Sequence, residues 1–139
     1  MEWHTLRPWD EAPPILRELK KAYRLAIVTN CSERLGRAAA ERVGVPFDVI
    51  VTSERAGFYK PDPRPYRLAL RELDLNPAEA LFVAGSGFDL VGTAGVGLDT
   101  YWHNRVGLPR PATAAAPLWE SRSLDALGHY LIPGQGENS

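Results

Sequence analysis

The sequence predicts a three-layer α/β fold of the Rossmann-like type, in which a parallel β-sheet lies between two layers of helices. Short apolar runs without polar alternation recur along the chain, and such runs are typical of strands that are buried on both faces. Segments with helical spacing of apolar residues separate these runs, which favours a parallel sheet. Of the 139 residues, 45% are hydrophobic and 24% are charged, a balance that excludes a wholly disordered chain. We expect a single domain.

Two helices are expected to flank the first strand. Apolar residues recur at helical spacing over residues 11–23, where two prolines in the first turn are tolerated. The apolar run at 25–28 predicts a buried strand. Ser32 is a suitable N-cap for a helix over 33–43, and Gly44 is expected to end that helix.

The same alternation continues in the middle of the chain. A second strand is predicted at 47–51, and a short turn or helix follows at 53–57. Prolines make residues 59–63 a rigid loop, after which a helix is expected over 65–73. The apolar run at 80–84 predicts the third strand.

The C-terminal part of the chain carries weaker signals. A glycine-bearing loop leads into a helical segment at 89–94, and a fourth, shorter strand is predicted at 100–102. Residues 110–117 are rich in Ala and Pro and are expected to form a surface loop. A short helix at 123–127 and a last strand at 129–132 complete the prediction.

Composition and the chain ends restrict the function classes. Lys and Arg number 16 and Asp and Glu number 17, and the resulting net charge of -1 gives no support for a nucleic-acid-binding surface. No apolar run reaches the ~18 residues of a membrane span. Residues 1–10 resemble a linker rather than a signal peptide, and residues 133–139 are expected to form a frayed tail. The single cysteine can form no internal disulfide, which fits a cytoplasmic protein.

Ligands of parallel α/β proteins bind at the carboxyl ends of the strands, so the loops after the strands are where candidates are expected. The first of these loops holds Thr29, Asn30 and Cys31. A hydroxyl and an amide before a helix N-terminus can cradle an anion, because free backbone N–H groups point the same way. Helix capping is the alternative interpretation of this loop.

Two later loops hold further candidates. Lys60 lies among prolines that fix the backbone, and a lysine held in this way can counter a carboxylate or an anionic substrate. A solvated surface lysine is the alternative. The loop after the third predicted strand presents Ser86 and Asp89 toward the strand ends. A Rossmann phosphate loop is disfavoured there, because Leu90 stands where a third glycine is required.

Three segments are specific in combination: LAIVTNCS at 25–32, GFYKPDPRPY at 57–66 and LFVAGSGFDL at 81–90. Together they resemble the haloacid dehalogenase superfamily, and more closely its 2-haloacid dehalogenase branch. The stretch YWHNRVGLP at 101–109 resembles the closing strand of that branch. The resemblance covers nearly the whole chain. It implies a hydrolase that acts through an ester formed on an attacking aspartate.

The resemblance also implies roles for individual side chains. Three are implied to bind the substrate, a small anion: Thr29, Asn30 and Tyr66. Three are implied to act in catalysis: Lys60, Ser86 and Asp89. In that scheme the threonine hydroxyl holds the anionic group of the substrate, and the lysine steadies the charge on the nucleophile and its intermediate.

Metal use separates the branches of this superfamily. Its phosphatases typically carry Gly-Asp in the fourth motif, and that acid helps to bind magnesium. This chain has Ala84 and Gly85 at those positions, which resembles the metal-free dehalogenase branch. We therefore expect no metal and no other cofactor, with magnesium on Asp89 as the alternative.

The superfamily begins with an apolar strand that ends in the nucleophilic aspartate, followed by a helical cap. No apolar strand precedes residue 24, so we expect a partial core domain that lacks its N-terminal strand and is inactive alone. One alternative is a non-catalytic module that binds an anion or a partner. Another is a magnesium-dependent phosphatase completed by another chain.

The resemblance places the absent strand between the predicted strands at 24–29 and 80–84. Unpaired backbone groups on both sides of such a gap are costly when they are buried. Direct closure of the two strands, insertion of residues 1–9, or pairing with a second chain would each repair it. The last repair needs the least rearrangement, so we expect a partner strand, supplied by a homo-oligomer or by the absent N-terminal segment.

Overall fold

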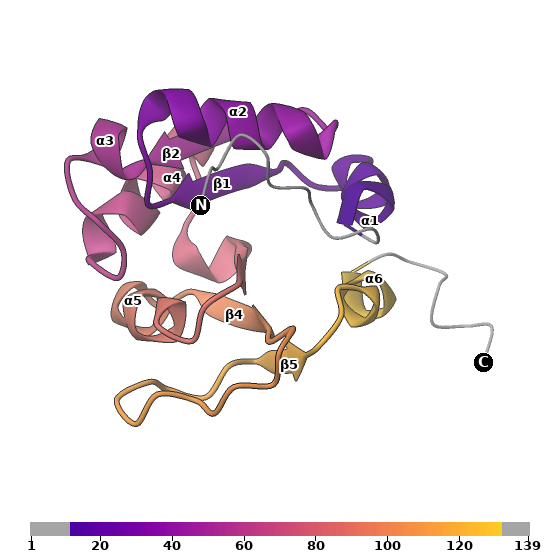
Figure 1. Cartoon of the computed structure of the whole chain (residues 1–139), viewed down its shortest axis with the longest axis vertical. Coiled ribbons are helices and arrows are strands. Elements are labelled where there is room, and N and C mark those ends of the chain that lie inside the picture. Colours follow the sequence, from indigo (N-terminus) through magenta and orange to yellow (C-terminus); the bar gives the residue numbers. More distant parts are fainter. Residues whose placement is uncertain (1–11, 132–139) are drawn as a thin grey trace.

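The computed structural model of the chain describes residues 12–131, in which helices and strands alternate (Figure 1). The described strands are β1 (Ala26–Thr29), β2 (Val49–Thr52), β3 (Leu81–Ala84), β4 (Asp99–His103) and β5 (Trp119–Ser121). The described helices are α1 (Ala12–Lys20), α2 (Glu33–Val43), α3 (Ser53–Ala56), α4 (Pro63–Leu73), α5 (Asp89–Val96) and α6 (Asp125–Leu131). A 3-10 turn at Pro77–Glu79 precedes β3.

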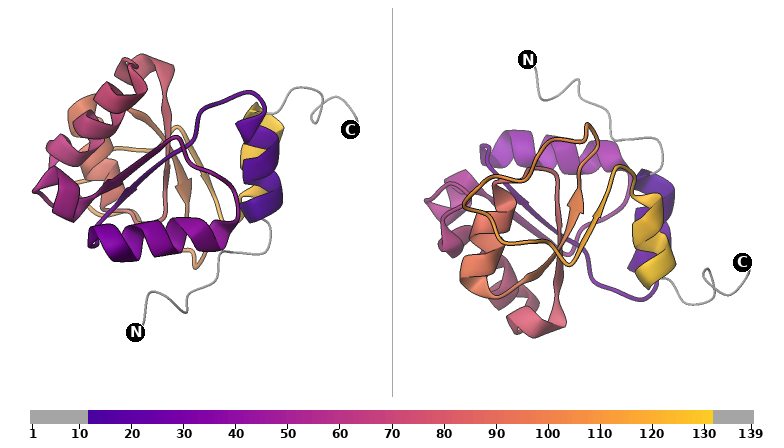
Figure 2. Two further views of the ribbon diagram at one scale, coloured as in Figure 1. Left: turned by 90° about the horizontal axis from the view of Figure 1, so that it is seen from above. Right: turned by 90° about the horizontal axis from the view of Figure 1, so that it is seen from below.

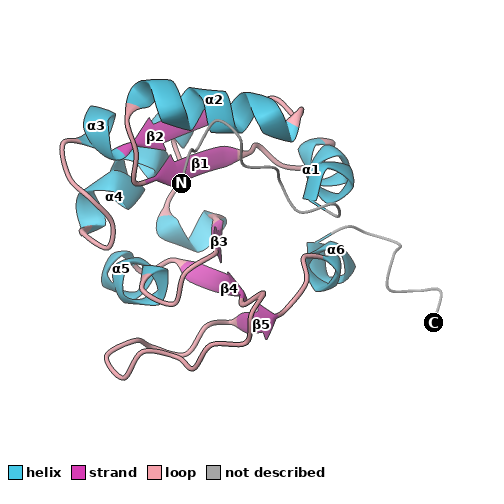
Figure 3. Cartoon of the chain, in the orientation of Figure 1, coloured by secondary structure: helices cyan, strands magenta, loops and turns pink. Residues whose placement is uncertain are grey.

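All strand pairs are parallel, but the strands form two separate sheets. β1 pairs with β2, and β4 lies between β3 and β5. Figure 3 shows the first pair apart from the other three strands. Within residues 12–131, no β-ladder joins β1 to β3. The parallel sheet that the sequence predicts is therefore interrupted between these two strands, where the resemblance places the absent strand.

Helices cover both sides of the strands. α4 and α5 lie together on one side, and α1 and α6 lie side by side on the other (Figure 2). α2 packs against β2. A buried cluster joins α1, α6 and β4 and includes Leu19, Leu127 and Tyr101. This arrangement confirms the predicted three-layer α/β fold.

Local sequence signals explain several element boundaries. Ser32 caps α2 as predicted, because its Oγ accepts a hydrogen bond from Leu35 N at 3.2 Å. Gly44 ends the same helix in the left-handed conformation, with φ 75°. α4 begins two residues earlier than predicted, because Asp62 Oδ1 accepts from Arg64 N at 2.9 Å and caps the helix there.

The predicted last strand at 129–132 is wrong. Residues 129–131 belong to α6, in which Leu127 and Leu131 continue a helical spacing that begins at Leu124 and packs toward α1. The fifth strand is β5, whose sequence Trp-Glu-Ser contains no apolar run. Its strand conformation comes from pairing with β4, a long-range contact that the local sequence does not signal.

Two predicted segments, the linker at 1–10 and the tail at 133–139, lie outside the described residues. Between residues 12 and 131, no helix combines the length and the hydropathy that crossing a membrane requires.

Candidate active site

Three loops bring candidate residues together at the carboxyl ends of β1 and β3. Thr29 ends β1 and Asn30 follows it, while Asp89 begins α5 shortly after β3. Lys60 lies in the loop that precedes α4. Direct contacts join this loop to both strand ends, so the position expected for a ligand site in a parallel sheet holds these side chains.

Lys60 and Asp89 form a largely buried ion pair. Lys60 Nζ lies 3.1 Å from Asp89 Oδ1 and 3.4 Å from Oδ2. The side chain of Asp89 is 6% exposed and that of Lys60 is 17% exposed. Lys60 Nζ also lies 5.6 Å from the ring centre of Phe82, within the range of a cation–π contact. Because a buried carboxylate is costly when it is unpaired, the lysine compensates the charge of Asp89.

Tyr66 completes this cluster from α4. Its hydroxyl donates a hydrogen bond of 2.6 Å to Asp89 Oδ1, and its side chain is fully buried. Phe82 meets the tyrosine ring edge-on at a centroid distance of 5.1 Å. A Cβ atom at Gly92 would collide with the same ring, so the glycine leaves room for it. Burial raises the pKa of Tyr66, and the hydrogen bond to Asp89 and the charge of Asp89 raise it further, which makes Tyr66 a proton donor in this hydrogen bond.

Asn30 fixes the backbone of the lysine loop. Its Nδ2 donates to Lys60 O at 3.1 Å, and Lys60 N donates to its Oδ1 at 2.7 Å. The Lys60–Pro61 peptide bond, which follows these two hydrogen bonds, is cis. Both polar atoms of the Asn30 amide are thus engaged with Lys60. Its predicted contact with the substrate stays a prediction.

The N-terminus of α2, one part of the predicted anion cradle, is filled by the chain itself. Glu33 N donates to Glu54 Oε1 at 2.9 Å, and Leu35 N donates to Ser32 Oγ. A carboxylate from α3 therefore takes the place that an external anion would have at the Glu33 amide. The capping interpretation holds for Ser32.

The two remaining predicted residues differ in their surroundings. Thr29 is half-buried, and its Oγ1 accepts from Cys31 Sγ at 3.6 Å. It lines the same cavity as Lys60 and Asp89. Ser86 is exposed, and its Oγ accepts from Phe88 N at 3.2 Å within its own turn. Its catalytic role stays a prediction.

The cluster does not fit a magnesium ion. Magnesium usually keeps several waters and binds proteins through one or two carboxylates whose oxygens are free to face it, and among the described residues Asp89 is the carboxylate at this site. One oxygen of Asp89 already accepts the Tyr66 hydroxyl, and both oxygens face the Lys60 ammonium. In the described part of the chain, no group of three or more His, Cys, Asp or Glu side chains is placed to hold a metal.

A cavity of about 890 Å³ separates the two sheets and reaches the Lys60–Asp89 pair. Its described lining includes three carboxylates: Glu79, Asp89 and Asp99. Glu79 precedes β3 and Asp99 begins β4, so both lie at the amino ends of the strands, away from the lysine. Of these three described carboxylates, Asp89 is therefore the one that lies where the cavity meets the carboxyl ends of the strands.

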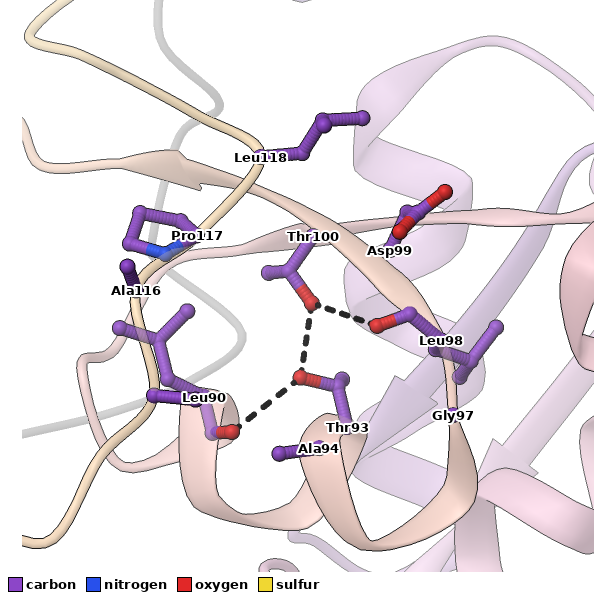
Figure 4. Close-up of a pocket in the computed structure, with 11 residues that line it drawn as sticks. Leu90, Thr93, Ala94, Gly97, Leu98, Asp99, Thr100, Ala116, Pro117 and Leu118 are labelled. Carbon is purple, nitrogen blue, oxygen red and sulfur yellow. Dashed lines mark hydrogen bonds between the residues drawn. The ribbon is translucent and has the colours of Figure 1, made fainter.

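A second cavity, of about 400 Å³, lies at the amino end of β4 (Figure 4). Thr100 Oγ1 donates to Thr93 Oγ1 at 2.7 Å, and Thr93 Oγ1 in turn lies 3.5 Å from Leu90 O. These hydroxyls bond to one another and to the backbone, so they stabilise the fold around α5 rather than present a ligand site.

Comparison with known proteins now defines the family. The model of the haloacid dehalogenase-like hydrolases matches residues 1–97. The chain belongs to this family. An (S)-2-haloacid dehalogenase from Pseudomonas sp. (strain YL) is 36% identical over 135 residues, which are 95% of this chain and 58% of that protein. The (S)-2-haloacid dehalogenase 1 of Pseudomonas sp. (strain CBS-3) is 30% identical over 133 residues, 94% of this chain and 59% of that protein.

Solved structures lead to the same family. The crystal structure of a dehalogenase with an intermediate complex matches with a TM-score of 0.86 and 31% identity, over 94% of this chain and 59% of that one. The chain thus spans a little under three fifths of the length of the curated relatives that it matches.

Three parts of this candidate site were not predicted from the sequence. Gly92 was detectable, because it lies three residues after Asp89 on the same helix face and so faces what Asp89 contacts. Phe82, which touches both Lys60 and Tyr66, was read only as a residue of a buried strand. Nothing in the sequence near Glu54 indicates that it caps α2 across the β1–β2 pair.

Proposed function

We propose that this chain forms part of a 2-haloacid dehalogenase type hydrolase, which removes halide from a small 2-haloacid. In this proposal the chain supplies the residues that stabilise the charge of the attacking carboxylate and of the substrate. The observation that carries this proposal is the buried Lys60–Asp89–Tyr66 cluster, which reaches a large cavity at the carboxyl ends of parallel strands. The (S)-2-haloacid dehalogenases among its relatives support this substrate class.

The reaction proposed for the whole enzyme has two steps. A carboxylate oxygen attacks carbon 2 of the haloacid, and the halogen leaves with the electron pair of its bond. Water then cleaves the resulting ester, which gives the 2-hydroxy acid and regenerates the carboxylate. The Lys60 ammonium is suited to hold the attacking carboxylate ionised, and Thr29 is suited to bind the carboxylate of the substrate from the end of β1.

Asp89 is unsuited to be the attacking group. Its side chain is 6% exposed, and its oxygens are engaged by Tyr66 and Lys60. Its contacts favour a positioning role, in which it sets the place of the lysine ammonium. This supports the proposal that the nucleophile comes from outside the described residues and that the chain alone lacks turnover.

Halide release from (S)-2-chloropropionate tests this proposal. We expect the purified chain to release no halide above the buffer blank, while addition of 2-chloropropionate shifts the NMR signals of Lys60 and Thr29. Turnover by the homogeneous chain that disappears in Lys60→Ala would contradict the proposal.

A non-catalytic module is the second candidate, because Asp89, the described carboxylate beside Lys60, is unsuited to be the attacking group. This candidate and the first both predict anion binding by the chain alone. They differ when the absent part of the enzyme is added, because only the hydrolase then gains turnover. Phosphate release from p-nitrophenyl phosphate with magnesium is expected of neither, since Asp89 does not fit a metal ion.

A further inference from the structure

Gly36 stands inside α2, at a place where glycine is unfavourable. Apart from proline, glycine is the residue least suited to a helix interior, whereas alanine is the best suited. Gly36 has no positive φ, and its N–H donates to Ser32 O at 2.9 Å in the ordinary helical pattern. The backbone conformation therefore does not require a glycine here. The reason lies in what α2 packs against, which is β2 and the end of β1 (Figure 1).

Three side chains converge on the space that a Cβ atom at Gly36 would take. Such a Cβ would lie 2.6 Å from Cγ2 of Thr52, 3.2 Å from Sγ of Cys31 and 3.4 Å from Cγ2 of Thr29. Carbon atoms at 2.6 Å overlap, since their optimal separation is about 3.5–4.0 Å. The three residues come from the ends of β1 and β2 and from the turn before α2. The glycine thus lets α2 lie directly on the strand end that carries Thr29.

The methyl group of Thr52 is held in this space by the hydroxyl group beside it. Thr52 is fully buried, and its Oγ1 donates to Glu33 Oε1 at 2.6 Å and accepts from Arg55 N at 3.1 Å. These two hydrogen bonds fix the place of Oγ1, and a threonine with a fixed Oγ1 also has a fixed methyl group. A larger residue at position 36 would therefore push α2 away from the strands.

The same packing fixes the side chain of Thr29. Its Cγ2 methyl group faces the backbone of α2 at Gly36, and its Oγ1 accepts from Cys31 Sγ at 3.6 Å. Both branches of this threonine are thus held in one rotamer. Because Oγ1 accepts from the thiol, its own proton can be donated to a further acceptor. Thr29 lines the large cavity together with Lys60, so an anion bound there can be that acceptor.

We propose that Gly36 is a positioning residue of the candidate active site, which acts on an anionic substrate through Thr29. By its lack of a side chain, Gly36 brings α2 onto the end of β1 and keeps the Thr29 hydroxyl in a single rotamer beside the cavity. The part of this inference that concerns the substrate rests on the proposed function. The part that concerns the rotamer depends on no ligand.

NMR of the full chain tests the rotamer first. Three-bond couplings across χ1 of Thr29 report whether its side chain holds one rotamer or averages over three. We expect one rotamer in the unmodified chain and averaged couplings in Gly36→Ala, because the added methyl group pushes α2 and Cys31 away from Thr29. Gly95→Ala is the matched control, since a Cβ at Gly95 on α5 faces open space, and it should leave the couplings unchanged.

A second substitution separates positioning from a general loss of stability. Thr52→Ser removes the Cγ2 that lies 2.6 Å from the new Cβ and keeps the hydroxyl with its two hydrogen bonds. The remaining contact, 3.2 Å to Cys31 Sγ, needs a shift of only a few tenths of an ångström. We therefore expect the double variant Gly36→Ala/Thr52→Ser to regain a single Thr29 rotamer. Thr52→Ser alone should keep it.

Titration with (S)-2-chloropropionate then measures the effect on anion binding. When Thr29 averages over three rotamers, about one third of the molecules hold the binding rotamer, so the dissociation constant rises about threefold. We expect this rise in Gly36→Ala and its reversal in the double variant. If the unmodified chain bound no 2-chloropropionate, the proposed function would fail, and the couplings would still decide the role of Gly36.

Thr29→Ser tests the same contact if Gly36→Ala does not fold. It keeps the hydroxyl and removes the methyl group that packs on α2 at Gly36. We expect this variant to fold and to show averaged couplings, because serine lacks the second branch that holds threonine in place.

Four results would overturn the proposal. Thr29 could average over its rotamers in the unmodified chain, which would mean that the packing does not fix it. Its couplings could stay those of one rotamer in folded Gly36→Ala or, where that variant does not fold, in Thr29→Ser. The double variant could stay averaged, which would trace the effect to a weakened helix rather than to the clash with Thr52. A dissociation constant that stays unchanged while the couplings average would remove the role toward the substrate.

Discussion

At the residue scale, the hydroxyl of Tyr66 is the contact that most directly holds Asp89. Tyr66→Phe removes this hydroxyl and keeps the ring against Phe82. Hydrogen bonds to buried charged groups contribute about 1.5–3 kcal/mol, so we expect the free energy of unfolding to fall by about that amount. Urea denaturation measures it. Tyr59→Phe is the matched control, because Tyr59 is 70% exposed, and it should leave the unfolding free energy unchanged.

The raised pKa of Tyr66 makes a second prediction, on alkaline stability. Burial and the neighbouring Asp89 keep the tyrosine protonated in the folded chain to a higher pH than in the unfolded chain, where tyrosine ionises near pH 10. Above about pH 10 the unfolded chain therefore holds fewer protons, and the stability due to Tyr66 is lost as the pH rises further.

The free energy of unfolding, measured from pH 8 to pH 11, checks this. We expect it to decline more steeply above about pH 10 in the unmodified chain than in Tyr66→Phe. Equal slopes in the two proteins would show that Tyr66 titrates normally.

The placement of Thr29 and Lys60 beside the same cavity was predictable from the sequence, while their roles stay predictions. Each follows from a loop after a strand or from a proline-rich sequence around it. The partners were not predictable, because they are set by contacts over long sequence separations. Asp89 meets Tyr66 from 23 residues away, and Asn30 meets Lys60 from 30 residues away.

At the scale of elements, α5 packs one of its faces closely against the ring of Tyr66 from α4. Gly92→Ala would place a Cβ atom against the ring of Tyr66, whereas Gly95 on the same helix faces open space. We expect Gly92→Ala to destabilise the fold by about 1–3 kcal/mol through overpacking. Gly95→Ala should stabilise it by up to about 1 kcal/mol through helix propensity. Thermal unfolding of both variants measures the contrast, and equal shifts of the two melting temperatures would refute the packing argument.

The elements that the sequence predicts well are those with their own end signals. α2 carries Ser32 at its start and Gly44 at its end, and its predicted bounds are confirmed. β5 and α6 are different, because their assignment depends on other elements. The three residues of β5 become a strand through β4, and α6 is fixed by leucines that meet α1.

At the scale of the whole molecule, the two sheets are joined by helices rather than by a ladder. Leu127 of α6 is 1% exposed in the cluster that connects α1 to Tyr101 of β4. We expect Leu127→Ala to cost about 2–5 kcal/mol, because it opens a cavity at this junction. Leu118→Ala is the control, since that leucine is 51% exposed and should cost little. Urea denaturation should show one transition for the unmodified chain, and two transitions would show that the sheets unfold independently.

The central proposal is that the Lys60–Asp89 pair stabilises the charge of an attacking carboxylate supplied from outside the described residues. Halide release from (S)-2-chloropropionate, measured after adding the part of the Pseudomonas sp. (strain YL) relative that lies outside the match, tests it most directly. We predict no release from either component alone, release from the mixture, and no release from the mixture when the chain carries Lys60→Met. Release by this chain alone, or release from the mixture that Lys60→Met leaves unchanged, would contradict the claim.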